Sequence, residues 1–264
     1  MLPVIEAAHK QGYYVITCDY LPDNVAHQYA DEYHNVSIID KESVLRLSKE
    51  LSIDGIMSFA VDPGVMTAAY VQEQMGLPAF GPYESVCILQ NKDYFRSFLA
   101  EHDFNVPKAK GFSSLDEALA DKDWYPWPCI VKPTDSAGSK GVMRVDTLEE
   151  LERALRYAFE HSLSKRVIVE EFIEKQGCSS DSDCFSLNGK LKFISFSAQR
   201  FDENAVGPYV PSAYSWPSSM NMQQETELTS EIQRLLSLLK MRTSIYNIET
   251  RVGMNGKPYI MEVS

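Results

Sequence analysis

The chain has 264 residues, enough for one large domain or two modest ones with a core that needs no disulfide or metal. Hydrophobic residues make up 44% and charged residues 23%, which is ordinary for globular proteins and excludes a mainly disordered or fibrous chain. The net charge of −12 argues against nucleic acid or an anionic membrane as the main partner, because both require a basic surface.

The first part of the chain alternates helical and strand patterns. A helical pattern opens the sequence, and strand-like runs follow at 13–18, 35–39 and 55–59, separated by helical stretches. One of these helices follows Asp40, a capping residue. The alternation predicts a parallel sheet with helices on both faces.

The two ends of the sequence and one internal segment bear on domain organisation. Met1 already lies in the helical pattern, whereas an α/β domain normally opens with a strand, and PYIMEVS closes the sequence in a strand pattern. We therefore expect a piece that lacks its first strand and continues beyond residue 264. The turn-rich segment at 76–82 predicts a boundary, which gives domains at 1–83 and 84–264.

The second part begins with a helical pattern near 91–101, followed by a mixture of strands and helices. Capping boxes at Ser114 and Thr147 each predict a helix start. Strand-like runs surround these helices, Asn188-Gly189 predicts a hairpin turn, and a last helix ends near Lys240. The cysteines number five without a CxxC pair, which is typical of free thiols in a reducing compartment, and no apolar run could span a membrane. We expect a cytoplasmic protein.

A hairpin with an Asn-Gly turn ends the chain and brings two carboxylates together. The runs YNIETRV and KPYIMEVS flank Asn255-Gly256, the strongest signal for a two-residue turn, because both positions tolerate positive φ. With these residues at the centre of the turn, Glu249 lies directly opposite Glu262. Two like charges that face each other across a pair of strands are destabilising. A divalent cation such as Mg²⁺ would relieve this repulsion by binding both carboxylates.

Two further residues and one alternative belong to the same pair of strands. Asn247 lies opposite Ser264, two residues along on the same face as the carboxylates. The alternative is an exposed carboxylate pair that solvent and Arg251 relieve. Both interpretations stay open at this level.

A polar loop and two lysines form the second signal. The loop TDSAGSKG follows the strand-like run 127–133, and its small residues can bring backbone N–H groups onto a phosphate, although it is neither a Walker A nor a Rossmann motif. Lys132 lies near the end of the buried strand and needs a partner there. Lys92 is another candidate cation. The alternatives are an ordinary surface loop and a solvated helix residue.

The run VIVEEFIE, at 167–174, is the third signal. Apolar strand residues lead into Glu170 and Glu171 and then Phe172 and Ile173. An extended segment of this kind can offer backbone C=O and N–H groups to the edge of an adenine ring, while apolar side chains hold its faces. The alternative is an edge strand that ends in charged residues.

In combination, these segments resemble the ATP-grasp superfamily. Lys92, IVKP with its loop, VEEFI and the Glu249–Glu262 pair occur in that family's order and spacing over about 83–264, and the carbamoyl-phosphate-synthase-like and amino-acid-ligase-like members are the most similar. The resemblance implies an α/β and α+β fold, in which a Rossmann-like, parallel α/β pre-ATP-grasp domain precedes a two-lobed ATP-grasp domain with lobes at about 108–173 and 174–264. It implies an enzyme that uses ATP and Mg²⁺ to phosphorylate a small-molecule carboxylate, and an amine or similar nucleophile then attacks the acyl phosphate. A homodimer is left open.

The resemblance also implies roles for individual residues. Lys92 and Lys132 resemble the lysines that contact the phosphates, and Glu170 resembles the acid at the adenine site. Glu171 C=O and Ile173 N–H would contact the ring. The flexible loop over the β- and γ-phosphates would consist of residues 136–141, with Ser136, Gly138, Ser139, Lys140 and Gly141 as its candidate contacts. The metal ligands would be Glu249 and Glu262, supported by Asn247 and Ser264.

Two arginines and an aromatic-rich loop are candidates for the substrate. Arg200 and Arg251 would bind the acyl-phosphate oxyanion or a substrate carboxylate, since Arg binds both in a bidentate manner. Either one is alternatively a surface ion pair. The aromatic residues around loop 201–221 shape the substrate pocket or only pack there; they are Tyr209, Tyr214 and Trp216.

The chain departs from the family pattern at three places. The family has Asn two residues after the second metal Glu, where this chain has Ser264, and Asn247 is expected to substitute. The ribose-binding acid is expected at Asp181 or Asp183. A catalytic arginine of the family lies beyond the last residue. An ATP-binding module without ligase activity is therefore the second hypothesis, whereas a nicotinamide-dependent oxidoreductase is excluded for want of a glycine-rich turn.

Overall fold

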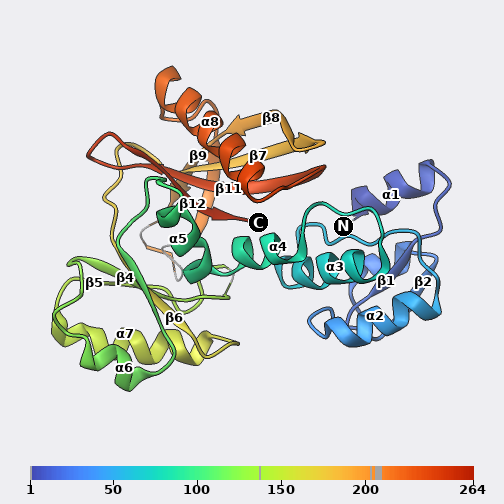
Figure 1. The fold of residues 1–264 in the computed structure, drawn as a ribbon, viewed down its shortest axis with the longest axis horizontal. Coiled ribbons are helices and arrows are strands. Elements are labelled where there is room, and N and C mark those ends of the chain that lie inside the picture. The colour runs from blue at the N-terminus through green and yellow to red at the C-terminus, as the bar shows by residue number, and fades with distance from the viewer. Residues whose placement is uncertain (1, 137, 203, 206–209) are drawn as a thin grey trace. The chain divides into compact units, whose positions relative to one another are not determined.

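A computed structural model of the chain describes residues 2–136, 138–202, 204–205 and 210–264 (Figure 1). It divides into two compact units, Met1–Val86 and Cys87–Ser264. All five cysteines are free thiols. Among the described residues, no helix is both long enough and apolar enough to cross a bilayer.

The first unit contains a short parallel sheet and several helices. Its strands β1 and β2 pair in parallel, with Ile16 opposite Glu32. Asp40 begins the second helix by accepting a hydrogen bond from the N–H of Ser43. Its elements, in chain order, are α1 (Leu2–Lys10), β1 (Ile16–Cys18), η1 (Val25–Tyr29), β2 (Glu32–His34), α2 (Lys41–Glu50) and α3 (Asp62–Met75), and α4 (Tyr83–Gln90) crosses into the second unit.

The apolar core of the first unit lies between α2 and α3. Val44 and Leu45 of α2 pack against Val71 of α3, which is fully buried. Burying one such side chain contributes on the order of 1.5–3 kcal/mol. This packing holds the two helices together.

Two of the three strands expected in this unit are not observed. The second strand occupies Glu32–His34 rather than 35–39, and residues 55–59 form no strand. In the first segment Val36 packs on the apolar core while Ile39 is exposed, so the run does not behave as a buried strand. In the second, the carbonyl of Ile56 accepts a hydrogen bond from the side chain of Gln72 on α3. The predicted sheet is therefore two-stranded among the described residues.

The second unit holds a four-stranded antiparallel sheet in the order β3-β6-β4-β5. Its strands are β3 (Ala109–Phe112), β4 (Cys129–Pro133), β5 (Met143–Val145) and β6 (Val167–Glu171), and its helices are α6 (Leu115–Ala120) and α7 (Leu148–His161). Figure 1 shows both helices together beside this sheet. Leu151 and Leu155 of α7 are fully buried against Val131 and Val169 in one apolar cluster.

A second four-stranded antiparallel sheet has the order β12-β11-β7-β8. It consists of β7 (Ser180–Leu187), β8 (Lys190–Phe196), β11 (Ser244–Val252) and β12 (Pro258–Val263), and α8 (Met222–Leu238) lies along it in Figure 1. β9 (Ala198–Phe201) and β10 (Pro211–Ser215) form a separate antiparallel pair. Asn221 begins α8 with a capping box that it shares with Gln224.

The hairpin of β11 and β12 has the predicted carboxylate pairing but not the predicted turn. Glu249 does lie opposite Glu262. The turn, however, is one residue longer than expected, because the N–H of Gly253 donates to the carbonyl of Lys257, and Gly256 alone in this turn has a positive φ. A β-bulge between Glu249 and Thr250 shifts the register back by one residue.

Helix α5 (Lys92–Glu101) connects to the first sheet through a partly buried ion pair. Asp93 binds both Nε and Nη2 of Arg166, at 3.1 and 2.5 Å. Gly111 of β3 lies against this pair, since a Cβ atom there would be 2.8 Å from Asp93 Oδ2. Glycine is therefore required for the close approach of helix and strand.

Candidate functional site

Three charged side chains from three elements meet in the interior of the second unit. Glu170 of β6 binds Arg96 of α5, with 2.8 Å between Oε2 and Nε, and its other oxygen Oε1 binds Nζ of Lys132 on β4. Glu170 lies opposite Ile130, two residues from Lys132 on the same face of β4, which explains why the two side chains meet. Arg96 and Glu170 are each 3% exposed at the side chain.

The electrostatic balance of this cluster favours the charged form of Glu170. Burial by itself would raise the pKa of Glu170, but Arg96 and Lys132 outweigh it and lower the pKa to about 2. Burial lowers the pKa of Lys132, and the attraction of Glu170 offsets this only in part. Glu170 is therefore an ionised acceptor at any physiological pH.

Lys92, the first residue of α5, links this cluster to the second sheet and to the polar loop. Its Nζ lies 2.8 Å from Glu262 Oε1 and 3.1 Å from the carbonyl of Ser136. Its own N–H donates to the carbonyl of Thr134, at 3.2 Å. The structure thus brings together two lysines and two acids that are far apart in the sequence.

The carboxylates of the second sheet form a row across three strands. Asp181 of β7 and Glu262 of β12 each lie opposite Glu249 of β11. Burial raises the pKa of Glu249, and although Arg251 lowers it, Glu262 and Asp181 raise it again. Burial would likewise raise the pKa of Glu262, but Lys92 and Lys132 bring it below its usual range. Positively charged neighbours thus outweigh burial at Glu262 but not at Glu249.

Asp181 occupies this row rather than a separate position. Burial raises its pKa, and hydrogen bonds from Tyr214 and Asn247 offset this only in part. Its Oδ1 atom is buried without a hydrogen-bond partner among the described residues. In the part of the chain that the structure describes, no group of three or more His, Cys, Asp or Glu side chains is already arranged around a metal-sized site.

Asn247 and Ser264 are paired through their backbones. The N–H of each donates to the carbonyl of the other, at 2.9 and 2.8 Å. The side-chain Nδ2 of Asn247 donates to Asp183 Oδ1 at 3.2 Å. This places the amide of Asn247 beside the carboxylate row.

The polar loop has a backbone that few sequences could adopt. Gly138, Ser139 and Gly141 all have positive φ, and a Cβ atom at Gly141 would be 2.7 Å from Pro133 Cγ. The hydroxyl of Ser136 donates to the carbonyl of Lys140 across the loop. Ala137 lies outside the described residues.

The segment that follows Glu170 continues along the edges of two other strands. The N–H of Glu171 donates to the carbonyl of Lys108, and that of Phe172 donates to the carbonyl of Pro128. The carbonyl of Ile173 accepts a hydrogen bond from Arg251 Nη1 at 3.2 Å. Arg251 is thereby tied to this segment.

The two candidate arginines both have partners within the protein. Arg251 also contacts Ser179 Oγ through Nε at 3.2 Å and Glu249 Oε1 through Nη2 at 3.4 Å. Arg200, which is exposed, contacts Ser215 Oγ and lies 3.3 Å from Cys178 Sγ through Nη1. Arg200 therefore lies apart from the cluster of Lys92, Lys132 and Glu170 in its contacts.

The aromatic residues of the neighbouring loop are placed in part. Trp216 donates from Nε1 to Ser195 Oγ at 3.0 Å and is largely exposed. Burial raises the pKa of Tyr214, and the nearby carboxylate of Asp181 raises it further. Tyr209 lies outside the described residues. Tyr214 thus faces the carboxylate row.

Arg96 is the residue that sequence reasoning missed. It follows Lys92 by four positions, and residues four apart lie on one face of a helix, so the run KDYFR carried a signal that could have found it. The ion pair of Asp93 and Arg166 was missed as well, because its two members come from distant elements.

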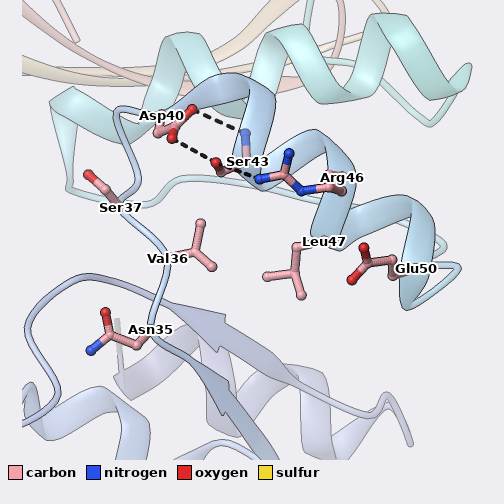
Figure 2. Close-up of a pocket in the computed structure, with 8 residues that line it drawn as sticks. All are labelled: Asn35, Val36, Ser37, Asp40, Ser43, Arg46, Leu47 and Glu50. Carbon is pink, nitrogen blue, oxygen red and sulfur yellow. Dashed lines mark hydrogen bonds between the residues drawn. The ribbon is translucent and has the colours of Figure 1, made fainter.

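A hollow of about 330 Å³ lies in the first unit beside α2 and is shown in Figure 2. Ser43 accepts from Arg46 and donates to Asp40 there, so these polar side chains already bind one another. Nothing in this hollow involves the residues of the charged cluster.

The sequence and the fold of this chain are similar to those of known proteins. The ATP-grasp domain family matches residues 125–264. The carbamoyl phosphate synthase large chain of Thermotoga neapolitana is 25% identical over 98% of this chain and 23% of its own length, so the chain spans about a quarter of that relative. A crystal structure of L-amino acid ligase from Bacillus licheniformis has a TM-score of 0.79 at 25% identity, over 99% of this chain and 63% of that one.

A second solved structure contains a nucleotide. The biotin carboxylase domain of 2-oxoglutarate carboxylase from Hydrogenobacter thermophilus, in complex with MgADP, ADP and bicarbonate, has a TM-score of 0.76 at 15% identity, over 100% of this chain and 61% of that one. At that identity the likeness concerns the fold, a mixed α/β architecture. Because the domain family covers more than half of the sequence, this chain belongs to the ATP-grasp family.

Proposed function

We propose that this chain is the nucleotide-binding part of an ATP- and Mg²⁺-dependent ligase, which activates a small-molecule carboxylate as an acyl phosphate for attack by an amine or similar nucleophile. The observation that carries the proposal is the meeting of Lys92, Lys132 and Glu170 beside the pair Glu249 and Glu262. Membership of the ATP-grasp family and the likeness to an L-amino acid ligase support it.

Lys92 and Lys132 would bind the phosphates in this proposal. Both Nζ atoms are held by carboxylates of the site, so their charges are in place for an anion. The loop with Ser136, Gly138, Ser139, Lys140 and Gly141 would cover the β- and γ-phosphates, since backbone N–H groups in such a turn bind anions. Glu170 would accept the adenine amino group, with Glu171 C=O and Ile173 N–H on the ring edge and Phe172 beside it.

The carboxylate row fits a magnesium ion. Carboxylate oxygens are the ligands that Mg²⁺ prefers, Glu249 lies opposite both Glu262 and Asp181, and Oδ1 of Asp181 is buried without a hydrogen-bond partner among the described residues. Glu249 and Glu262 would hold the ion, with Asn247 and Ser264 in support. When bound, Mg²⁺ neutralises charge on the phosphates and aligns the transferred group. Asp181 would lie by the metal or by the ribose.

We also propose a domain organisation, a cellular location and contacts to the substrate. Residues 1–83 would be a Rossmann-like pre-ATP-grasp domain, and 84–264 the ATP-grasp domain, with lobes at about 108–173 and 174–264. A cytoplasmic location is consistent with the five free thiols. A homodimer stays open. Arg200 and Arg251 would contact the acyl phosphate or the substrate carboxylate.

A second candidate function is nucleotide binding without ligase activity. The observation that favours it is that Arg251 and Arg200 already bind protein groups, Arg251 three of them. An arginine engaged in this way has fewer donors for a substrate. The two functions differ in whether ADP release depends on both a carboxylate and an amine.

Thermal unfolding with Mg·ATP, Mg·GTP and NAD tests nucleotide binding. At about 100 times its Kd, Mg·ATP should stabilise the chain by about 2.7 kcal/mol, or roughly 5–10 °C, and the other two should stabilise it less. Glu262→Gln should abolish the shift, whereas Glu227→Gln on the exposed side of α8 should retain it. An equal shift in the Glu262 variant would contradict the metal assignment. ADP release with both substrates would then separate ligase from binding module.

A further inference from the structure

Arg96 is a buried cation that has no role in the proposed reaction. Its side chain is 3% exposed, and its Nε donates to Glu170 Oε2 at 2.8 Å. Its Nη1 and Nη2 atoms are buried without hydrogen-bond partners among the described residues. An unsatisfied buried donor costs about 1–3 kcal/mol, so an arginine in this position needs a reason beyond packing.

The two oxygens of Glu170 bind two different cations, a lysine and an arginine. Lys132 binds Oε1 and Arg96 binds Oε2, which fixes both carboxylate oxygens. Lysine is a point charge on a flexible stem and loses its proton readily when buried, whereas arginine stays charged in proteins and is planar. Of the two cations that bind Glu170, Arg96 is therefore the one that keeps its charge in the protein interior.

An ionised carboxylate in this place can select a nucleobase. It has only acceptors, about four lone-pair directions in all, so it can take one more N–H beside its two cations. The 6-amino group of adenine supplies such an N–H, whereas the 6-oxo group of guanine would place an acceptor against an acceptor. Selectivity of this type comes from the mismatched partner as much as from the matched one.

We propose that Arg96 is a positioning residue that holds Glu170 as the acceptor for the 6-amino group of adenine and so sets the preference of this site for adenine nucleotides. This inference rests on the proposed function, and within it on Glu170 at the adenine. Arg96 itself would contact Glu170 and not the nucleotide.

A second ion pair of helix α5, which is only partly buried because the Arg166 side chain is 33% exposed, provides a control that distinguishes this role from a structural one. Asp93 of α5 is buried and binds Arg166, whose Nη1 also donates to Ser113 Oγ. This pair does not touch Glu170 in the described structure. Breaking it should weaken the fold without changing base preference, and Arg166→Met is therefore the matched control.

The test compares two nucleotides by direct titration of the full chain with Mg²⁺ present. Mg·ATP is set against purine riboside 5′-triphosphate, which lacks only the 6-amino group. A hydrogen bond to a charged group is worth about 1.5–3 kcal/mol, so the wild-type chain should prefer ATP by roughly 10–100-fold. Arg96→Met should reduce this ratio to within about threefold, Arg96→Lys should keep only part of it because a buried lysine loses its proton readily, and Arg166→Met should keep it in full.

The outcomes distinguish this inference from the function on which it rests. A wild-type chain that binds neither nucleotide overturns the proposed function and the inference with it. A wild-type chain that prefers ATP, with the same preference in Arg96→Met, overturns the inference alone. Should Arg96→Met fail to fold, Arg96→Gln replaces it, and an unchanged ratio in that folded variant overturns the inference equally.

Discussion

At the scale of single residues, the charged cluster around Glu170 shows how much a buried acid depends on its partners. Taking a charge out of water costs several kcal/mol per ion, and removing one partner of a buried pair typically costs 3–5 kcal/mol. Glu170 binds one cation with each oxygen. The cluster therefore makes this region sensitive to any change that neutralises one member.

Glu170 makes the stability of the chain depend on acid pH. Its pKa of about 2 is below the ordinary value of 4.5, so ionised Glu170 stabilises the fold above pH 4.5, and that contribution is lost as the pH falls toward 2. Between pH 5 and pH 3 we expect a loss of on the order of 2 kcal/mol from this residue. Urea unfolding at both values measures it.

The comparison variant for this pH dependence is Glu170→Gln. It should be less stable than the wild type at pH 7, because Lys132 and Arg96 lose their partner, yet it should lose less on going from pH 5 to pH 3. An equal loss in both proteins would show that other carboxylates carry the acid sensitivity.

The sequence indicated some of these residues but not their partners. Lys132 could be expected to need a partner because it lies near the end of a buried strand. That the partner is Glu170 depends on the pairing of β4 with β6, strands that are separated by β5 and α7 along the chain. Long-range pairing of this kind is not encoded in local spacing. The i, i+4 spacing of Lys92 and Arg96, by contrast, is a local signal that the sequence carries.

At the scale of elements, the final hairpin reached the predicted pairing through two deviations. The loop around Asn255 is one residue longer than the Asn-Gly rule gives, and the bulge near Glu249 restores the offset. Side chains alternate along a strand, so an uncorrected slip of one residue would have moved one carboxylate to the other face. The Asn-Gly pair predicts where the turn lies but not its exact length. The bulge that compensates for the longer turn has no sequence signature of its own.

The failed strand predictions have a related cause. Segments 35–39 and 55–59 have strand-like composition, but a strand exists only where a neighbour pairs with it. Here the backbone of Ile56 binds a side chain of α3 instead. Helices α2 and α6, by contrast, begin at the predicted capping residues Asp40 and Ser114, whose contacts are local. Helix α7 also begins after the predicted Thr147, but without a hydrogen bond from that side chain to the helix.

Gly111 of β3 lies so close to Asp93 of α5 that a side chain there would clash. In Gly111→Ala the new Cβ would lie 2.8 Å from Asp93 Oδ2 and 3.2 Å from Arg166 Nη2, which would push this ion pair apart. We expect a loss of about 1–3 kcal/mol in the free energy of unfolding, as for other overpacked sites. Gly55→Ala, where no atom lies within 4 Å, is the control and should be nearly neutral. Equal stability of the two variants would exclude close packing as the role of Gly111.

At the scale of the whole molecule, the chain consists of two units that each have an apolar core. Val44, Leu45 and Val71 form the core of the first, and the cluster around α7 with Leu151 and Leu155 forms that of the second. The residues proposed to bind the nucleotide all belong to the second unit. A sequence alone could suggest this division through the turn-rich segment at 76–82, but not which residues fill each core.

Separate cores predict separate unfolding transitions in calorimetry. Leu155→Ala should lower one transition, because removing a fully buried leucine typically costs 2–5 kcal/mol, which corresponds to several degrees for a unit of this size. Val71→Ala should lower the other. Mg·ATP should raise only the transition that Leu155→Ala lowers, since a ligand stabilises the part of the chain that binds it. If both substitutions moved one and the same transition, the two units would fold as a single cooperative body, and nucleotide binding would then stabilise the first unit as much as the second.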